Sequence, residues 1–212
     1  MDTGWSADCV NHPIRHLGFG LWFASEPVLK EGESVPEQLL KIGLKPQDIN
    51  AIVLTHLDCD HVSGLLPLKE VKHIYCSQEE WGHAQKKDVR YRKAFWKSAH
   101  VEMLAMQDDP KAPFGKSCDL FGDGSVRVIF TPGHSEGSVA ILAYDGGNYA
   151  AFVGDDSYNR HSWEELKLPG PVYDEKEMLT TLKWVQSLSK DPACIGIYAA
   201  HDGEGPVGTE DK

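Results

Sequence analysis

The chain has 212 residues, of which 41% are hydrophobic and 25% are charged, and these values predict one globular domain over residues 1–212. Its formal net charge of −11 argues against a nucleic-acid partner, since phosphate binding needs a basic face. No apolar run approaches the roughly 20 residues that a membrane span requires, so we expect no membrane partner.

The first half of the chain contains a predicted helix, two predicted strands and a second, polar helix. Glu33–Gly43 has apolar residues at helical spacing and ends at a glycine, as helices commonly do. Ile52–Leu54 and Lys72–Tyr75 are predicted strands. From Glu79 to Leu104 the pattern predicts a helix with embedded aromatic residues.

The second half is richer in β-branched and aromatic residues. Its predicted strands are Val126–Phe130, Ser138–Tyr144, Tyr149–Val153 and Ile195–Ala199. The segment Asp145-Gly-Gly-Asn148 predicts a hairpin turn. Apolar residues at helical spacing predict an amphipathic helix over Glu175–Ser189. This order of elements predicts an α+β fold, with two sheets packed face to face and helices outside.

The cysteines indicate the compartment. All five are widely spaced without a C-x-x-C pair, which is typical of reduced thiols: Cys9, Cys59, Cys76, Cys118 and Cys194. The first residues show neither a basic leader nor an apolar segment, so no secretion signal is visible. We therefore expect a cytoplasmic protein.

Four side chains with metal-ligand chemistry lie within six residues, directly after the apolar run Ala51–Leu54. They are His56, Asp58, Asp60 and His61. A strand that ends in such a cluster presents several ligands toward one side. The sequence therefore indicates a metal site at this strand end.

Three further candidate ligands each follow a predicted strand. They are His134, Asp155 and His201. Two divalent ions about 3.5–4 Å apart need a bridging oxygen and terminal ligands on either side. The seven side chains together have the chemistry for such a pair of ions.

This set resembles the metallo-β-lactamase superfamily, whose H-x-H-x-D-H motif is followed by a His, a bridging Asp and a last His. The resemblance runs from the Asp2-Thr-Gly4 loop to His201 and implies a four-layer αβ/βα sandwich. It implies that one metal is bound by His56 and His134, the other by Asp60, His61 and His201, with Asp155 and a hydroxide bridging them. The expected cofactors are two divalent ions, zinc first, with manganese or iron as alternatives.

Asp58 departs from that pattern, because the superfamily usually has its second His there. The diiron flavoprotein branch has a Glu at this point. With Asp58, Asp60, Asp155 and one hydroxide, two divalent ions are fully neutralised, whereas a histidine at position 58 would leave one positive charge. The extra carboxylate favours harder ions such as Mn²⁺ or Fe²⁺. From the sequence alone, Asp58→His is expected to raise zinc affinity.

The start of the chain is a second departure, since superfamily members normally have one or two strands before the Asp2-Thr-Gly4 loop. We expect either a truncated start or a partner that covers the exposed sheet edge. A homodimer is one such partner.

Tyr158 lies three residues after Asp155, as a tyrosine does in the N-acyl homoserine lactonases, which the segment Leu39–Pro46 also resembles. That resemblance implies that Tyr158 donates to the substrate carbonyl or oxyanion. We assign catalytic roles to Asp60 and Tyr158. The alternative for Tyr158 is a strand cap with its hydroxyl in solvent.

The leading hypothesis is a hydrolase that attacks a lactone or related ester of a small-molecule substrate with a metal-bridging hydroxide. The alternatives are a thioester hydrolase, a β-lactamase-like hydrolase, a diiron oxidoreductase-like protein and a catalytically silent metal-binding protein.

Other polar residues near these motifs leave alternatives open. Asp156 and Asp202 either hold a ligating histidine or face water. Cys59 is predicted to be a core thiol. The run Lys86–Lys97 has six basic residues against Asp88, and either attracts an anionic substrate, meets an acidic partner or forms a solvated helix face.

Overall fold

The computed structural model describes residues 1–86, 88–203 and 207–208. The chain divides into two compact units, Met1–Met103 and Leu104–Lys212, and each is described by itself. Among the described residues, no helix has both the length and the hydropathy to cross a membrane. The single domain over residues 1–212 stays a prediction.

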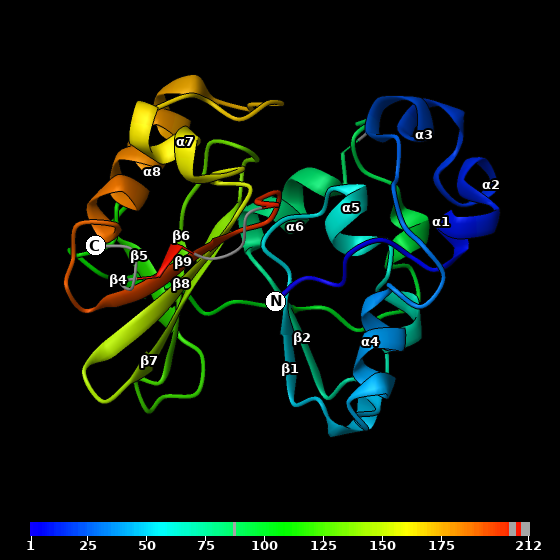
Figure 1. The fold of residues 1–212 in the computed structure, drawn as a ribbon, viewed down its shortest axis with the longest axis horizontal. Coiled ribbons are helices and arrows are strands. Elements are labelled where there is room, and N and C mark those ends of the chain that lie inside the picture. Colours follow the sequence, from blue (N-terminus) through cyan, green and yellow to red (C-terminus); the bar gives the residue numbers. More distant parts are fainter. Residues whose placement is uncertain (87, 204–206, 209–212) are drawn as a thin grey trace. The chain divides into compact units, whose positions relative to one another are not determined.

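The first unit is built on a small parallel sheet, in the order β1-β2-β3. Its strands are β1 (Ala51–Val53), β2 (His73–Cys76) and β3 (Glu102–Met103). The helices are α1 (Asp8–Asn11), α2 (Pro13–Leu17), α3 (Phe19–Ser25), α4 (Val35–Lys41), α5 (Cys59–Val62) and α6 (Gln78–Ala84), with short 3-10 turns at η1 (Pro46–Asp48), η2 (Leu66–Leu68) and η3 (Lys93–Phe95) (Figure 1).

Helix α4 confirms the first predicted helix, and its ends follow from local chemistry. Ser34 and Glu37 form a capping box, in which the Ser34 backbone N–H donates to Glu37 Oε2 at 3.1 Å. The chain leaves the helix at Ile42, and Gly43 then takes a φ of +78°, which glycine adopts without strain.

The helix predicted from Glu79 to Leu104 is wrong beyond its first two turns. Helix α6 ends at Ala84, and the described residues that follow are irregular apart from η3 and β3. Tyr91, Phe95 and Trp96 are each buried in the core of the first unit. Burial of these separate aromatic anchors outweighs helix propensity, and many basic residues on one helix would also repel each other.

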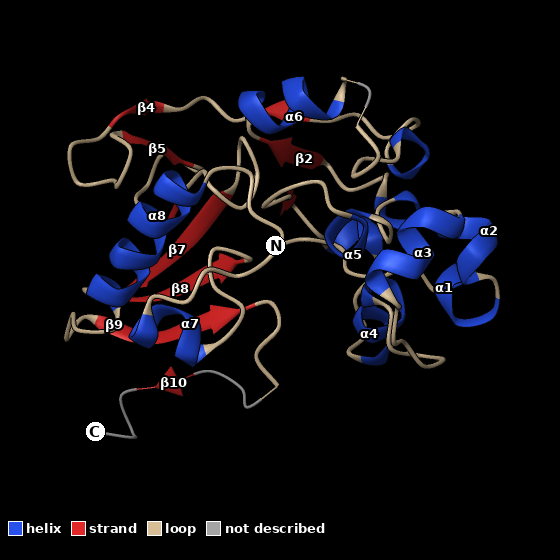
Figure 2. Cartoon of the chain, turned by 90° about the horizontal axis from the view of Figure 1, so that it is seen from above, coloured by secondary structure: helices blue, strands red, loops and turns tan. Residues whose placement is uncertain are grey.

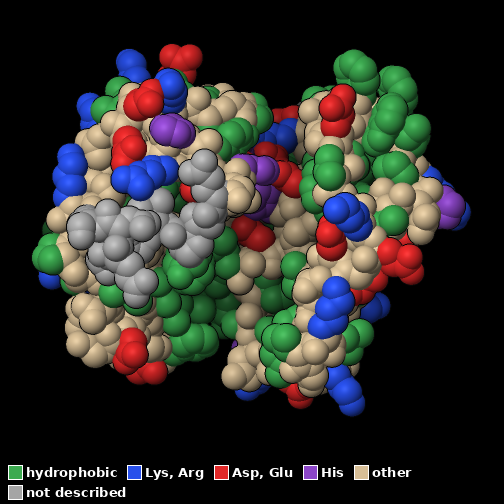
Figure 3. Space-filling view, in the orientation of Figure 1, with side chains coloured by type: hydrophobic (Ala, Val, Ile, Leu, Met, Phe, Trp, Pro, Cys, Tyr) green, Lys and Arg blue, Asp and Glu red, His purple; other side chains and the backbone are tan. Residues whose placement is uncertain are grey.

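The surface of helix α3 is unusually apolar. Phe19 and Phe23 are 67% and 68% exposed, and their rings stack with centroids 6.2 Å apart. Figure 3 shows hydrophobic side chains gathered on the surface where Figure 1 places α3. Exposed apolar patches are typical of interaction surfaces. The homodimer stays a prediction.

The second unit contains a seven-stranded sheet in the order β10-β9-β8-β7-β6-β5-β4. Its strands are β4 (Gln107–Asp108), β5 (Lys116–Asp119), β6 (Val126–Phe130), β7 (Val139–Asp145), β8 (Asn148–Gly154), β9 (Cys194–Ala199) and β10 (Val207–Gly208). The strands pair antiparallel except β8 with β9. The predicted hairpin is confirmed, with Asp145 opposite Asn148 and positive φ at both glycines between them.

Two helices pack on this sheet, α7 (Arg160–Glu165) and α8 (Glu175–Leu188) (Figure 2). Asp174 caps α8 by accepting hydrogen bonds from two backbone N–H groups of its first turn. The predicted amphipathic face is confirmed, because Met178, Leu182 and Val185 are fully buried against apolar residues of the sheet. The face-to-face packing of the two sheets stays a prediction.

Candidate metal centre

In the first unit, all four predicted ligands lie together where β1 ends. The chain is extended at Asp58, which precedes α5, so the helix carries Asp60 and His61 back toward His56. The His56 and His61 rings lie 4.0 Å apart between centroids. His56 Nε2 is 3.4 Å from Asp58 Oδ2, and His61 Nε2 is 3.6 Å from Asp60 Oδ2.

Asp2 fixes the orientation of His61. Its Oδ2 atom lies 3.0 Å from His61 Nδ1, and its Oδ1 atom accepts the Thr55 backbone N–H at 2.7 Å. Burial pushes the pKa of Asp2 upward, but the positive charge and hydrogen bonds of its neighbours outweigh this and leave the pKa below its ordinary value. A carboxylate on Nδ1 leaves Nε2 available to a metal.

Thr55 gives His56 the same arrangement. The Thr55 hydroxyl lies 2.9 Å from His56 Nδ1 and 2.9 Å from Asp2 Oδ2. Both histidines of the motif therefore have Nδ1 occupied and Nε2 facing a carboxylate. The role of Asp2 was not predicted, although the Asp2-Thr-Gly4 match was the signal that pointed to this loop.

Glu80 is a second residue that the sequence analysis missed. It is fully buried, and its Oε1 accepts the backbone N–H of Leu57 at 2.9 Å. Ser77 caps α6 by accepting the Glu80 backbone N–H at 3.1 Å, which fixes where this carboxylate lies. Since Leu57 stands between His56 and Asp58, Glu80 holds the backbone of the motif.

Asp58 has a strong partner of its own. Arg90 donates from Nε to Asp58 Oδ1 and from Nη2 to Asp58 Oδ2, the latter at 2.7 Å. The two side chains are only 19% and 14% exposed. A bidentate pair of this kind fixes both groups in one plane.

Cys59 confirms its prediction as a core thiol. It is buried, and its Sγ donates to Ser25 Oγ at 3.6 Å. Burial is the main cause that raises the pKa of this thiol to about 11, so it stays protonated at neutral pH. All five cysteines are free and buried.

In the second unit, His134 lies in the loop after β6. The loop is closed by a backbone hydrogen bond of 2.9 Å from Thr131 N–H to Ser138 O. The Thr181 hydroxyl of α8 donates to the Pro132 carbonyl at 2.9 Å. Gly133 has a φ of +134°, and a Cβ there would lie 2.4 Å from the Met178 backbone nitrogen. Only glycine allows the loop this close to α8.

Asp155 lies between the two predicted ligands of its own unit. Its Oδ2 is 3.5 Å from His134 Nε2 and 3.3 Å from His201 Nε2. His201 follows β9, the parallel neighbour of β8, and the Ala200 backbone N–H donates to the Gly154 carbonyl at 3.1 Å. One carboxylate oxygen placed between two imidazoles has the position of a bridging ligand.

Tyr158 lies against both histidines of this set. Its ring meets the His201 ring edge-on at 4.6 Å and the His134 ring at 6.3 Å between centroids. The hydroxyl donates to the Gly170 carbonyl. Tyr158 therefore lies beside the predicted ligands. In the role predicted for it, its hydroxyl would leave the Gly170 carbonyl and donate to a substrate oxygen instead.

The two neighbouring aspartates differ. Asp156 is 1% exposed, so it does not face water. Burial is the main cause that raises the pKa of Asp156 well above its usual range, and the charge of Asp155 adds to the rise. The nearby Thr131 hydroxyl lowers the pKa of Asp156 and so partly opposes this rise. Among the described residues, neither the Thr131 hydroxyl nor Asp156 Oδ2 has a hydrogen-bond partner at normal geometry. Asp202 is partly buried beside His201.

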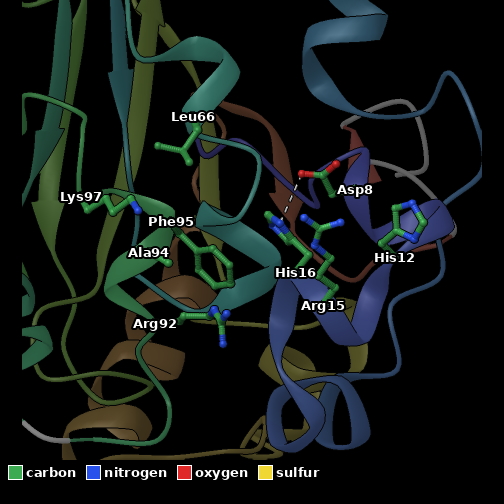
Figure 4. A pocket seen from close by; sticks show the side chains of 9 residues that line it. All are labelled: Asp8, His12, Arg15, His16, Leu66, Arg92, Ala94, Phe95 and Lys97. Atoms are coloured by element: carbon green, nitrogen blue, oxygen red, sulfur yellow. Dashed lines mark ion pairs between the residues drawn. The ribbon is translucent and has the colours of Figure 1, made fainter.

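The basic run does not form a solvated helix face. Arg90 turns to Asp58, Lys93 donates to the Gln85 carbonyl at 2.9 Å, and Lys87 lies outside the described residues. Arg92 and Lys97 line a cavity of about 420 Å³ within the first unit. Figure 4 shows this cavity, whose lining residues are Asp8, His12, Arg15, His16, Leu66, Arg92, Ala94, Phe95 and Lys97. None of them is a predicted metal ligand.

The donor set fits divalent metal ions by a simple geometric test. Two atoms that each lie about 2.0–2.2 Å from one tetrahedral ion are about 3.3–3.6 Å apart. The four imidazole–carboxylate pairs within the two units have distances of 3.4, 3.6, 3.5 and 3.3 Å. Imidazole nitrogen and carboxylate oxygen are ligands that suit zinc, manganese and iron.

The profile of the Metallo-beta-lactamase superfamily matches residues 21–201, which include all seven predicted ligands. The chain belongs to this superfamily. The resemblance stated from the motif is therefore confirmed, and with it the α+β fold class.

Among curated proteins, the chain is 27% identical to the N-acyl homoserine lactonase AttM of Rhizobium radiobacter over 181 residues, which are 80% of this chain and 64% of that protein. It is 29% identical to a probable metallo-hydrolase of Mycobacterium tuberculosis over 192 residues, which are 85% of this chain and 60% of that protein. The chain thus spans less than two thirds of the length of either relative.

Solved structures share the fold. A quorum-quenching N-acyl homoserine lactone lactonase superposes with a TM-score of 0.73 and 21% identity, covering 96% of this chain and 74% of that one. An N-acyl homoserine lactone hydrolase with N-hexanoyl-L-homoserine at its catalytic metal centre gives a TM-score of 0.71 and 22% identity, covering 96% of this chain and 76% of that one.

Proposed function

We propose that this protein is a dinuclear metal-dependent hydrolase that opens a lactone or cleaves a related ester of a small molecule. The observation that carries the proposal is the set of four imidazole–carboxylate pairs at 3.3–3.6 Å, two in each unit, in the ligand order of the superfamily. The lactonases among the relatives support an ester carbonyl as the reacting group.

The proposed centre uses both units. His56, Asp58 and His134 would bind one ion, while Asp60, His61 and His201 would bind the other. Asp155, whose Oδ2 faces two histidines, would be shared. We propose zinc as the native metal, with manganese or iron as alternatives that the carboxylate-rich set also suits. When bound, two such ions supply a nucleophile from water at neutral pH and polarise the carbonyl.

Two side chains would act on the substrate. The Tyr158 hydroxyl would donate to the carbonyl oxygen, where negative charge develops during attack. The Asp60 carboxylate is 21% exposed, so a substrate can reach it. It would accept a proton and deliver it to the oxygen of the leaving alcohol. These roles rest on the position of Tyr158 against His134 and His201 and of Asp60 among the predicted ligands.

The test is Tyr158→Phe, assayed on a panel of lactones and thioesters with metal content measured in parallel. We expect kcat for lactones to fall by about 10–100-fold while metal content stays unchanged. Tyr198→Phe is the matched control, because Tyr198 stacks on Phe152 in the neighbouring strand and should leave kcat unchanged. Wild-type rates of Tyr158→Phe on every accepted lactone would show that the role is wrong.

The same panel separates the other functions. Turnover of thioesters without lactones favours the thioester hydrolase. An iron pair with a visible spectrum favours the diiron protein, and bound metal without any turnover favours a silent metal-binding protein. We also propose a cytoplasmic location, since all five cysteines are free and buried.

A further inference from the structure

The Asp58–Arg90 pair explains how an aspartate can stand where the superfamily usually has a histidine. Arg90 comes from the irregular segment that follows α6, 32 residues beyond Asp58. Its guanidinium contacts both oxygens of Asp58, and both side chains are largely buried. A buried charged pair of this kind is stable only if each partner is held in place.

Arg90 is held from several sides. Its backbone N–H donates to Asp88 Oδ1 at 2.9 Å, and its guanidinium carbon lies 5.9 Å from the centroid of the Tyr91 ring. The buried Glu80 carboxylate adds a favourable charge. Glu80 also accepts the backbone N–H of Leu57, so the carboxylate that favours the charge of Arg90 also holds the backbone of the motif. The guanidinium is therefore a built part of the motif.

Asp58 keeps one oxygen directed at the predicted metal ligands. Its Oδ2 accepts from Arg90 Nη2 at 2.7 Å and lies 3.4 Å from His56 Nε2. That second distance fits two ligands of one ion. A carboxylate oxygen has more than one lone pair, so it can accept from Arg90 and bind a cation together.

The charge of the motif follows from these contacts. A motif with histidines at three positions and one aspartate has a formal charge of −1. His56, Asp58, Asp60 and His61 have a charge of −2, and Arg90 returns the cluster to −1. The pair Asp58–Arg90 thus has the net charge of the neutral imidazole that it replaces.

We propose that Arg90 is a positioning residue that neutralises and orients Asp58, so that an aspartate and an arginine together replace the usual second histidine of the motif. This inference rests on the proposed function, because it takes Asp58 as a metal ligand. It assigns a role to one residue of the basic run that the metal motif alone left unexplained.

The test compares four proteins: wild type, Asp58→His, Arg90→Gln and the double variant. Zinc affinity is measured by competition with a chromophoric chelator, and the visible spectrum of the cobalt-loaded protein reports the ligand field. Asp58→His alone leaves an uncompensated buried guanidinium beside the ligands, so zinc should bind about 10-fold more weakly or worse. The double variant has the usual motif charge and should return to within about 3-fold of wild type.

Arg90→Gln alone gives the motif one more negative charge but removes the group that orients Asp58, so the cobalt spectrum should change from that of wild type. Arg90→Lys keeps the charge without the bidentate contact and should keep zinc affinity near wild type with an altered cobalt spectrum. Arg127→Gln is the matched control, since it breaks an Arg–Asp pair of 3.0 Å in the other unit and should change neither readout. Thermal melting confirms that each variant is folded.

Two results would overturn the inference. One is an Asp58→His protein that binds zinc as tightly as wild type or more tightly, as the motif alone predicts. The other is a double variant no better than Asp58→His. Either result with a metal-binding wild type leaves the proposed function standing, whereas a wild type that binds no divalent ion removes both.

Discussion

The two halves of the predicted ligand set are built by different means. In the first unit, four ligands lie within one short motif, and side chains from distant segments hold them: Asp2, Glu80 and Arg90. In the second unit, three predicted ligands come from separate strand ends. The backbone register of β8 and β9 places Asp155 and His201, and a loop closed by a backbone hydrogen bond after β6 places His134. Side-chain networks thus orient one half, and sheet geometry orients the other.

This difference decides which substitutions matter in each unit. A side-chain network fails when one hydrogen-bonding group is removed, because a buried partner is then left unsatisfied. A backbone arrangement tolerates such changes but fails when a larger side chain separates two elements. Substitutions of each kind in the two units therefore test this contrast.

The ligands themselves should be equally sensitive in both units. His61→Ala and His134→Ala are each expected to lower lactone turnover by more than about 100-fold and to lower bound metal, because each would remove a ligand of the proposed centre. Elemental analysis and initial rates measure both effects. His161→Ala is the control, since His161 is exposed and pairs across one helical turn with Glu165. If one of the two ligand variants kept full turnover, that unit would not contribute to the centre.

Alanine substitutions at the close backbone contacts should have the next largest effect. A Cβ at Gly133 would lie 2.4 Å from the Met178 nitrogen, and one at Gly64 would lie 2.4 Å from the Thr3 carbonyl oxygen. Each alanine variant should lose about 1–3 kcal/mol of unfolding free energy, with Gly133→Ala losing more because of its positive φ. Denaturant unfolding measures this. Gly82→Ala, which meets nothing within 4 Å, should not be destabilised.

Removal of one buried hydrogen-bonding side chain should lower the unfolding free energy more in the first unit than in the second. Glu80→Met leaves the buried Leu57 N–H without an acceptor and should lower unfolding free energy by about 1–3 kcal/mol, with loss of metal affinity. Thr181→Val removes a single hydrogen bond to the Pro132 carbonyl and should lower it by about 1 kcal/mol or less. Glu79→Met and Thr180→Val are the adjacent controls. Equal losses for Glu80→Met and Thr181→Val would contradict the contrast drawn between the units.

The sequence predicted the elements that have strong periodicity or clear turn chemistry. These are α4, β1, β2, β6, the hairpin of β7 and β8, α8 and β9. It missed α1 to α3 and α7, because four to seven residues show too little periodicity. It also predicted a long helix from Glu79 to Leu104, where buried aromatic anchors decide the path instead.

The candidate ligands could be named from the sequence because residue type, order and strand-end position agree in one motif. Their partners were not, because Asp2, Glu80 and Arg90 reach the motif only through tertiary structure. The Asp58–Arg90 pair also reverses the expectation for Asp58→His: the motif alone predicts tighter zinc binding, whereas an unpartnered Arg90 predicts weaker binding. The zinc affinity expected from a substitution at Asp58 therefore depends on the charge of the residue that contacts it.

The smallest expected effect is a pH dependence of stability that comes from His16 in the first unit. Burial lowers the pKa of His16 below its ordinary value of 6.5, although Asp8 opposes the shift from 3.4 Å. The unfolded chain therefore takes up a proton before the folded one, so stability is full above pH 6.5 and falls as pH drops below it. His16→Gln should lose this dependence, by about a few tenths of a kcal/mol between pH 7.5 and 5.5, since the ring is partly exposed. Urea unfolding at both pH values measures it, and an unchanged dependence would assign it to other groups.

In the proposed function, the two predicted ligand sets bind one pair of ions. Anomalous X-ray diffraction at the zinc edge, from crystals of the zinc-loaded chain, tests it directly. We predict two peaks about 3.5–4 Å apart. One would contact His56 and His134, and the other His61 and His201. Zinc held by ligands of a single unit, or no peak near either set, would contradict the claim.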